Sequence, residues 1–322
     1  MSTATVSRAL RGMPSVSEET RHRVLEVAAR LDYVASPQAS GLASGRTHAV
    51  GVIVPHVTRW FFASVVHGAE ARLREAGYDL LLYNLAGDAG ARHRVFRSHL
   101  LRKRVDALLV LSLTPTADEI AGVAKLDRPV AVVGARVPGW ASVRIDDVEA
   151  SRTAVRHLLE LGHRRIAMLG GSLEEVLDFV APLDRLTGFR QEMTAAGVPV
   201  DPAWEVTSDF TARGGQAATR LLLETGPRPT AIFAASDEMA IGAVHALREA
   251  GLRVPEDVSV IGIDDHEMAE FFELTTVAQP VFEQGRLAAE LLLEAITTGR
   301  DGTEVTVPTR LVVRGTTAPP SS

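Results

Sequence analysis

The sequence predicts an α/β protein in which two lobes, each built on a parallel sheet, follow a small all-α module. Three observations predict this architecture. From Ala49 onward, short runs rich in Val, Ile and Leu, such as AVGVIVP, alternate with longer amphipathic stretches. This alternation is typical of parallel strands covered by helices on both faces. It begins again after Asp147, which indicates a second lobe, whereas the first 35 residues carry helical spacing without a strand pattern.

The composition excludes several classes of protein. The 322 residues are 46% hydrophobic and 23% charged, which is ordinary for a globular protein. No apolar run approaches the ~18 residues that a membrane span needs, and since the N-terminus has no apolar core after its positive charges, we expect no secretion signal. The absence of Cys excludes disulfides and thiolate sites and is compatible with the cytoplasm, where we expect the protein to act. Since no G-x-S-x-G, phosphate-loop or H-E-x-x-H motif occurs, we expect no enzyme, metal or cofactor.

Charge is distributed unevenly along the chain. Residues 1–46 carry a net charge of +2, whereas the remainder carries −8. A mildly basic start on an acidic body fits a DNA-binding module attached to another domain, although chance asymmetry is an alternative.

The N-terminal module is expected to contain two short helices. Residues 4–12 form the first, which ends at Gly12. Ser17 caps the second, and its packing stripe consists of Val24, Val27, Ala28 and Leu31. Two helices this short bury little surface and need a third packing partner. The segment after Pro37 contains two glycines and no core pattern, so it predicts a flexible linker.

Strands and helices are expected to alternate through both lobes. The expected strands are 49–55, 78–84, 105–111, 129–134, 165–171, 230–236 and 258–264. The expected helices include 61–76, one ending at 161, 184–196, 211–224, 237–250 and 283–298, before strands near 305–313. In this architecture a ligand binds at the carboxyl ends of the strands, which here are Pro55, Gly134, Gly170, Ser236 and Asp264.

The runs ATVSRALRG and VSEETRHRVLEVAARLDYVASPQASGLASGRT resemble the DNA-binding headpiece of the lactose-repressor/galactose-repressor (LacI/GalR) family. The resemblance implies a recognition helix in the major groove. Its expected DNA contacts are Thr3, Ala4 and Arg8 to bases and Thr5 and Ser7 to the backbone. It also implies a hinge at 36–48 that folds on DNA, with Ala39 one turn before Leu42, which wedges into the minor groove. The alternatives are an ordinary capped polar helix and an exposed linker leucine.

The family pattern places another helix before this point, and the given sequence opens at Met1. We therefore expect a headpiece that lacks the first helix of its helix-turn-helix. A misplaced start is favoured over a natural truncation, because a valine encoded by GTG in the family's A-G-V-S motif could have been read as Met1.

Residues 49–315 resemble repressor cores and periplasmic sugar-binding proteins. The specific matches are R-x-x-G-F at 185–189, the run at 236–265 and LTTVAQP at 274–280. The implied organisation is a headpiece at 1–35, a hinge at 36–48, a core at 49–318 and a tail at 319–322. Within this core, lobe one comprises 49–147 plus 281–308, and lobe two comprises 148–280 plus 309–318.

The resemblance implies an effector site between these periplasmic-binding-protein-like lobes. Its expected residues are Phe61, Phe62, Arg185, Phe210, Ser236, Asp264 and Gln279. This set suits a polyol, because the carboxylate accepts hydrogen bonds from hydroxyls, the guanidinium donates and the Phe210 ring offers a flat face. The alternatives are a core role for Phe61 and Phe62, a turn cap at Asp264, and surface pairing of Arg185 with Asp184 or Asp178. Ser236 replaces a common Asn, and Ala135 stands where an acid is frequent, which leaves the sugar open.

These expectations indicate a homodimeric, allosteric transcription factor, a repressor of sugar-use genes that binds a near-palindromic operator. The rival interpretations are a sugar-binding receptor without DNA-binding activity and a regulator that keeps only effector sensing and dimerisation. Four properties stay open at this point: the identity of the effector, the sequence of the operator, whether the effector induces or corepresses, and whether the protein is a dimer or a tetramer.

Overall fold

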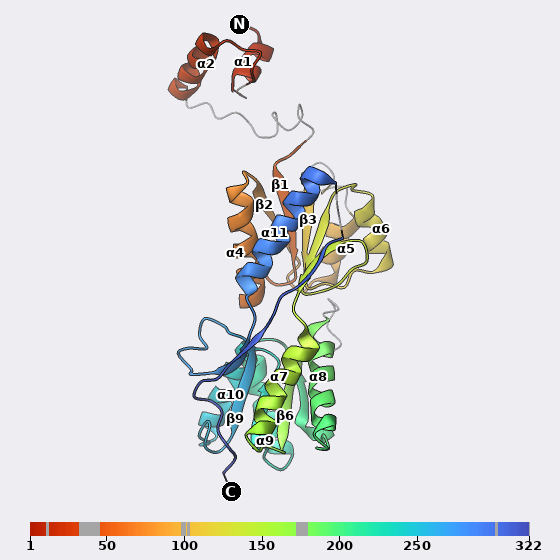
Figure 1. Ribbon diagram of the computed structural model, residues 1–322, viewed down its shortest axis with the longest axis vertical. Helices are drawn as coiled ribbons and strands as arrows, with labels where there is room; N and C mark the ends of the chain where they lie inside the picture. The colour runs from red at the N-terminus through yellow and green to blue at the C-terminus, as the bar shows by residue number, and fades with distance from the viewer. Residues whose placement is uncertain are drawn as a thin grey trace. The chain divides into compact units, whose positions relative to one another are not determined.

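The computed structural model describes residues 1–10, 13–31, 46–97, 101, 104–171, 180–299 and 302–321. Its packing divides the chain into two units, Met1–His48 and Ala49–Ser322 (Figure 1). We call the first unit the headpiece and the second the core.

The headpiece contains α1 (Thr3–Leu10) and α2 (Glu18–Arg30). Ser17 caps α2, because its side chain accepts a hydrogen bond from the Thr20 N–H at 3.4 Å. Ala9, Val16 and Val24 are buried together, with Val6 and Leu10 packed against them. The expected stripe on α2 was wrong at Val27 and Leu31, which are exposed, whereas Val24 is buried and Ala28 is half-buried. The short α1 covers only the part of α2 around Val24.

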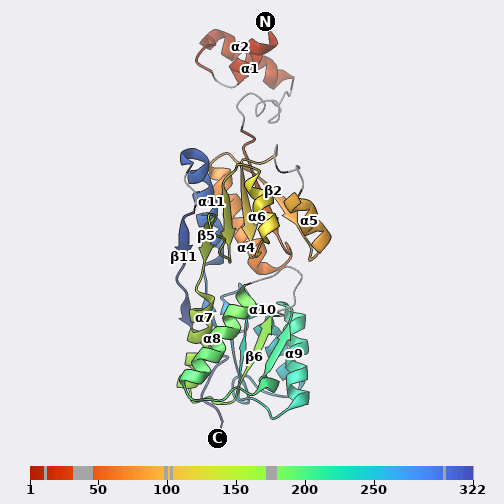
Figure 2. The same cartoon turned by 90° about the vertical axis from the view of Figure 1, so that its right-hand side faces the viewer.

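Lobe one is built on a six-stranded sheet of order β11-β5-β4-β3-β1-β2, in which every described pairing is parallel. Its strands are β1 (Ala49–Val54), β2 (Asp79–Asn84), β3 (Ala107–Leu111), β4 (Val130–Val133), β5 (Ala141–Arg144) and β11 (Glu304–Thr306). Helices α4 (Trp60–Glu75) and α11 (Val281–Thr298) cover one face, and α5 (Ala89–Arg97) and α6 (Ala117–Ala124) cover the other (Figures 1 and 2).

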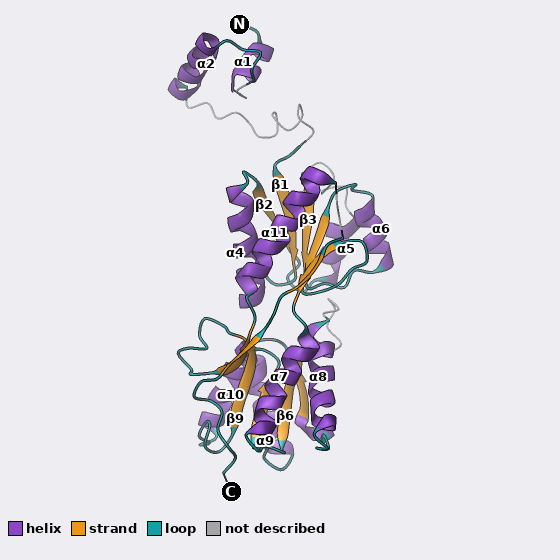
Figure 3. Ribbon diagram, viewed as in Figure 1, coloured by secondary structure: helices purple, strands orange, loops and turns teal. Residues whose placement is uncertain are grey.

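Lobe two repeats this plan with the order β12-β10-β9-β8-β6-β7. Its strands are β6 (Ile166–Gly171), β7 (Glu205–Ser208), β8 (Ala231–Ala234), β9 (Ser259–Asp264), β10 (Thr275–Ala278) and the antiparallel β12 (Arg310–Val312). Helices α7 (Asp147–Glu160) and α8 (Ala181–Ala195) cover one face, and α9 (Ala212–Thr225) and α10 (Asp237–Glu249) the other (Figure 3). A short 3-10 helix, η1 (Pro202–Trp204), precedes β7.

The expected strands and helices of the core are confirmed to within a few residues. Three strands were missed, namely β5, β7 and β10. Each has four residues, of which one is Val and none is Ile or Leu, so none carries the Val/Ile/Leu run that marks a buried parallel strand. Residues 32–45, which include Pro37, Ala39 and Leu42 of the expected hinge, lie outside the described residues.

The chain passes three times between the two sheets, from β5 to α7, from β10 to α11 and from β11 to β12. Along the chain, α11 and β11 of lobe one therefore come after most of the strands of lobe two. Helix α11 lies close along α4, since a Cβ added at Gly68 would stand 2.0 Å from the Phe282 carbonyl oxygen. A Cβ at Gly285 would likewise stand 2.1 Å from the Val65 carbonyl oxygen. Glycine at both positions allows this close packing.

Among the helices that the structure describes, none is long and apolar enough to cross a lipid bilayer.

Candidate effector pocket and its relatives

A pocket lies where the strands of both lobes end, and its empty space, open solvent included, is about 690 Å³. Its lining residues are Arg59, Phe61, Phe62, Ser112, Gly134, Ile145, Asp147, Ala181, Pro182, Arg185, Phe210, Ser236, Glu238, Asp264, Gln279 and Gln284. Ser112, Gly134 and Asp264 stand at the carboxyl ends of β3, β4 and β9, where α/β proteins bind ligands. All seven residues expected for the effector site line this one pocket.

Arg185 supplies a buried cation at the side of the pocket. Its Nε donates to Asp147 Oδ1 at 2.7 Å, its Nη1 donates to the Ala235 carbonyl, and Nη1 lies 3.9 Å from Asp264 Oδ1. The alternative of a surface pair with Asp184 was wrong, because the guanidinium is buried against these other partners. The other alternative partner, residue 178, lies outside the described residues.

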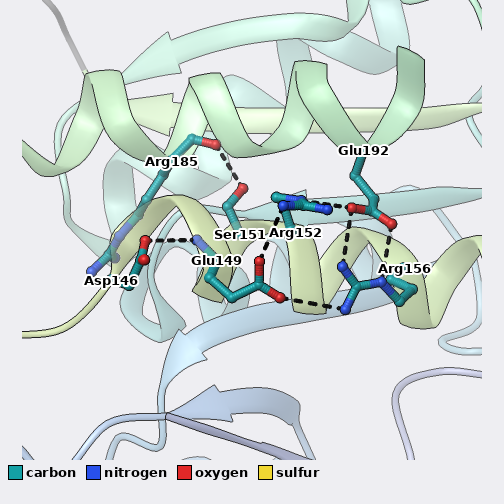
Figure 4. A network of polar contacts seen from close by, with 7 residues as sticks. All are labelled: Asp146, Glu149, Ser151, Arg152, Arg156, Arg185 and Glu192. Atoms are coloured by element: carbon teal, nitrogen blue, oxygen red, sulfur yellow. Dashed lines mark hydrogen bonds and ion pairs between the residues drawn. The ribbon is translucent and has the colours of Figure 1, made fainter. Parts of the chain in front are cut away.

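Contacts between α7 and α8 hold Arg185 in place (Figure 4). Ser151 Oγ donates to the Arg185 carbonyl oxygen at 2.6 Å. About two helical turns after Arg185 on α8, the Glu192 carboxylate accepts from Arg152 Nε at 2.9 Å and from Arg156 Nε at 3.0 Å. These bonds join the two helices along their length, so the base of the Arg185 side chain has little freedom to move.

Asp264 presents a buried carboxylate at the end of β9. Its backbone has a φ of 137°, a conformation uncommon for a non-glycine residue and concentrated at functional sites. Gln279 Nε2 donates to Asp264 Oδ1 at 2.6 Å, and Gln284 Nε2 donates to Gln279 Oε1 at 2.8 Å. Burial raises the pKa of Asp264 to about 6, although the nearby Arg185 guanidinium opposes this shift. Asp264 is thus a hydrogen-bond acceptor at neutral pH.

The start of α10 adds two further carboxyl groups. Asp237 is fully buried and accepts from Thr276 Oγ1 at 2.7 Å and from the His266 N–H at 2.8 Å. Burial and then the charge of Asp264 raise the pKa of Asp237 to about 8. Glu238 lines the pocket, and the same two causes raise its pKa to about 7.

Ser236 has a structural role in addition to its place in the pocket lining. It is the N-cap of α10, since its Oγ accepts a hydrogen bond from the Met239 N–H at 3.3 Å. The hydroxyl therefore stabilises the first turn of the helix that carries Glu238.

Aromatic rings from both lobes form the apolar walls. Phe61 and Phe62 pack edge to face with their ring centroids 5.4 Å apart, and Phe62 is buried whereas Phe61 is half-buried. The Phe210 ring lies against Gly171, where a Cβ would stand 2.1 Å from a ring carbon. Apolar walls around a few charged and amide groups are typical of small-molecule sites.

In the headpiece, the five expected DNA-contacting residues Thr3, Ala4, Thr5, Ser7 and Arg8 all belong to α1. The Arg8 side chain is exposed. The Thr5 hydroxyl lies 2.9 Å from Ser2 Oγ, which also accepts from the Thr5 N–H at 3.2 Å and so caps the helix.

The family of bacterial regulatory proteins named after LacI matches residues 1–36, and the periplasmic-binding-protein-like domain matches residues 155–317. The transcriptional regulator CelR of Thermobifida fusca is 38% identical over 323 residues, which cover 96% of this chain and 91% of CelR. The chain belongs to the LacI family. This LacI-family protein is accordingly a DNA-binding transcriptional regulator.

Two solved structures resemble this LacI-family protein over almost its whole length. The transcriptional regulator CelR in complex with cellobiose shares 33% identity and a TM-score of 0.76, with 98% of this chain and 96% of that chain covered. The lac repressor dimer bound to operator and the anti-inducer ONPF shares 29% identity and a TM-score of 0.87, with 99% and 96% covered. The family match at residues 1–36 disfavours the alternative of a receptor without DNA-binding activity.

Several lining residues were missed in the sequence, above all Asp147, Glu238 and Gln284. Glu238 lies inside the matched run at 236–265, so this match could have included it. Asp147 stands where the α/β pattern begins again, which is a second usable signal. Gln284 carried no signal, because its place in the pocket depends on how α11 returns to lobe one.

Proposed function

We propose that this protein is a homodimeric repressor, and that a sugar bound in the pocket between the lobes controls its affinity for a near-palindromic operator. The observation that carries the proposal is the pocket itself. It combines the carboxylate of Asp264, the guanidinium of Arg185 and the amide of Gln279 with aromatic walls from both lobes.

The chemistry of the pocket suits a sugar. Asp264 accepts hydrogen bonds from hydroxyls, and the pyranose or furanose C–H face packs on Phe210. Phe61 supplies a second apolar wall, and Ser236 and Phe62 complete the lining. The cellobiose complex of the relative CelR supports a carbohydrate, because the two chains are similar over nearly all of their length.

On the DNA side, we assign base contacts to Thr3, Ala4 and Arg8 and backbone contacts to Thr5 and Ser7. Each lies on α1, the helix that the resemblance identifies with major-groove recognition. The hinge at 36–48 is assigned the minor-groove contacts through Ala39 and Leu42. The operator-bound state of the similar lac repressor supports this assignment.

Dimerisation is supported by the lac repressor dimer and by an exposed apolar surface in lobe two. Phe271 is 78% exposed and Met268 is 40% exposed in the loop between β9 and β10. Large exposed apolar side chains that lie close together mark interaction surfaces. A two-fold dimer presents two headpieces to the two halves of a near-palindromic operator.

As a regulator of genes, the protein acts in the cytoplasm and catalyses no reaction. The relatives that support this inference bear the names of a transcriptional regulator, CelR, and a transcriptional repressor, CytR. Effector binding changes the closure of the lobes and the dimer contact of lobe one, and thereby moves the paired hinges apart. Sugar and operator are then coupled reciprocally, typically by about 1–3 kcal/mol.

A thermal-shift screen tests the effector class. We would heat the full chain with cellobiose, D-ribose, D-glucose or D-galactose, since ligand at about 100 times its dissociation constant stabilises the folded state by about 2.7 kcal/mol. At least one sugar is expected to raise the melting temperature. The shift should vanish in Asp264→Ala and persist in Asp257→Ala, which changes a surface partner of Arg253. A chain that no sugar stabilises contradicts the proposal.

A further inference from the structure

Gln284 is the residue through which helix α11 of lobe one contacts the polar side of the pocket. It is 1% exposed and bonded to Gln279, which follows β10 of lobe two. The close packing of α11 on α4, with Gly68 and Gly285 at the contact, holds the backbone beneath it. The Gln284 amide therefore stands at a defined place relative to both lobes.

The hydrogen-bond chain from Asp264 to Gln284 has a fixed direction. An ionised carboxylate only accepts, so Gln279 must present its NH2 group to Asp264, at 2.6 Å. Gln279 then faces Gln284 with its carbonyl oxygen, and Gln284 must donate its own NH2 group, at 2.8 Å. As a consequence, the carbonyl oxygen of Gln284 is turned away from Gln279.

The Gln284 carbonyl oxygen ends this series of hydrogen bonds, and no protein group among the described residues donates to it. In the part of the chain that the structure describes, Gln284 makes one side-chain hydrogen bond, which uses its Nε2. The side chain is nonetheless almost completely buried and lines the pocket. Among the described residues, this oxygen is not one of the buried side-chain atoms that lack a hydrogen-bond partner, so it is open to the pocket, where a ligand or water can donate to it.

We propose that Gln284 is a specificity-determining residue, whose Oε1 accepts a hydrogen bond from a hydroxyl group of the bound sugar. The inference rests on the proposed function and adds a second recognition point on lobe one, in addition to the acceptor that Asp264 provides on lobe two. A sugar satisfies both acceptors only if it carries two free hydroxyls at separate ring positions. Sugars that lack the hydroxyl facing Gln284 are selected against, because they displace water from this oxygen without donating a hydrogen bond to it.

Paired changes in the protein and the sugar test this contact. We would measure the affinities of D-glucose, D-ribose and cellobiose and of their monodeoxy analogues by calorimetry, with wild type and with Gln284→Met. Gln284→Met keeps the chain length and removes the amide. Gln216→Met is the matched control, because Gln216 bonds to Glu249 on the surface of α9 and α10, outside the pocket. Gln284→Leu is a second apolar replacement in case Gln284→Met does not fold.

Gln284→Met is expected to weaken the parent sugar about tenfold or more, and Gln216→Met should leave its affinity unchanged. One monodeoxy analogue should bind wild type and Gln284→Met equally, since it lacks the hydroxyl that Gln284 contacts. If both apolar variants bind the parent sugar and every analogue as wild type does, the inference is wrong and the proposed function stands. If wild type binds none of the sugars, the proposed function is wrong, and this inference, which rests on it, is wrong as well.

Discussion

The guanidinium of Arg185 and the carboxylate of Asp147 form a buried ion pair, with Nε 2.7 Å from Oδ1. The pair joins the beginning of α8 to the beginning of α7, and both residues line the pocket. Asp147 therefore orients the group that we assign to hydrogen-bond donation, and it offsets the charge of Arg185 when no ligand is bound. This dependence of the site on a supporting pair leads to the first prediction.

Arg185→Met should destabilise the core by about 3–5 kcal/mol, because the buried carboxylates of Asp147 and Asp264 then lose the cation that neighbours both of them. Arg220→Met, which removes an exposed partner of Glu249, should cost about 0–1 kcal/mol. The free energies of unfolding in urea would measure both effects. Equal losses in the two variants would show that the pocket pair contributes no more than a surface pair.

Glu238→Gln should reduce the dependence of stability on pH. Since the pKa of Glu238 rises in the folded state from 4.5 to about 7, the folded chain holds this proton more tightly than the unfolded chain. The resulting stabilisation is fully present below pH 4.5 and is lost as the pH rises to about 7.

Denaturant titrations across that pH window would compare wild type with Glu238→Gln. Wild type should lose more stability with rising pH than the variant does. Asp237 and Asp264 remain in both proteins, and their raised pKa values contribute a decline of the same sign. Identical pH profiles would mean that Glu238 titrates in the folded chain as it does in water.

Gly171→Ala should impair sugar binding through Phe210. The new Cβ would stand 2.1 Å from a ring carbon of Phe210 and would displace that ring from the pocket wall. Overpacking of this kind costs about 1–3 kcal/mol, which corresponds to about a tenfold loss of affinity if it falls on the bound state. Gly170→Ala is the neighbouring control, because its Cβ would meet only Met168 Cε, at 3.6 Å. Equal sugar affinities in the two variants would remove Phe210 from the proposed site.

Phe271→Asp should convert the dimer to monomer, because it places a charge in the exposed apolar surface that we assign to the subunit contact. Sedimentation velocity would measure the change in mass. Leu221→Asp is the control, because it places the same charge at an exposed apolar residue on α9 and should leave the dimer intact. A dimer that persists in Phe271→Asp would locate the contact elsewhere.

The lobes and most of the pocket could be predicted because their signals are local. Strand ends such as Asp264 lie after continuous apolar runs, and the resemblance then selected the polar and aromatic residues near them. The short strands β5, β7 and β10 escaped this reasoning, because four residues with few β-branched aliphatic side chains resemble loop sequence.

The missed polar contacts depend on tertiary arrangement. Arg185 meets Asp147 38 residues away in the sequence, because α7 and α8 pack together. Gln284 enters the pocket only because the chain returns from lobe two to lobe one before α11. No spacing in the sequence encodes either contact, and hydrophobic periodicity describes α11 without indicating what its first turn faces.

The central claim is that a sugar in the pocket alters binding to DNA. An operator would first be selected from random duplexes, and its affinity for the full chain would then be measured by fluorescence anisotropy with and without the stabilising sugar. In wild type the sugar should shift operator affinity by about 5- to 150-fold. Asp264→Ala should bind the operator as wild type does and should not respond to the sugar. An operator affinity that the bound sugar leaves unchanged in wild type, or that is lost in Asp264→Ala, would contradict the account.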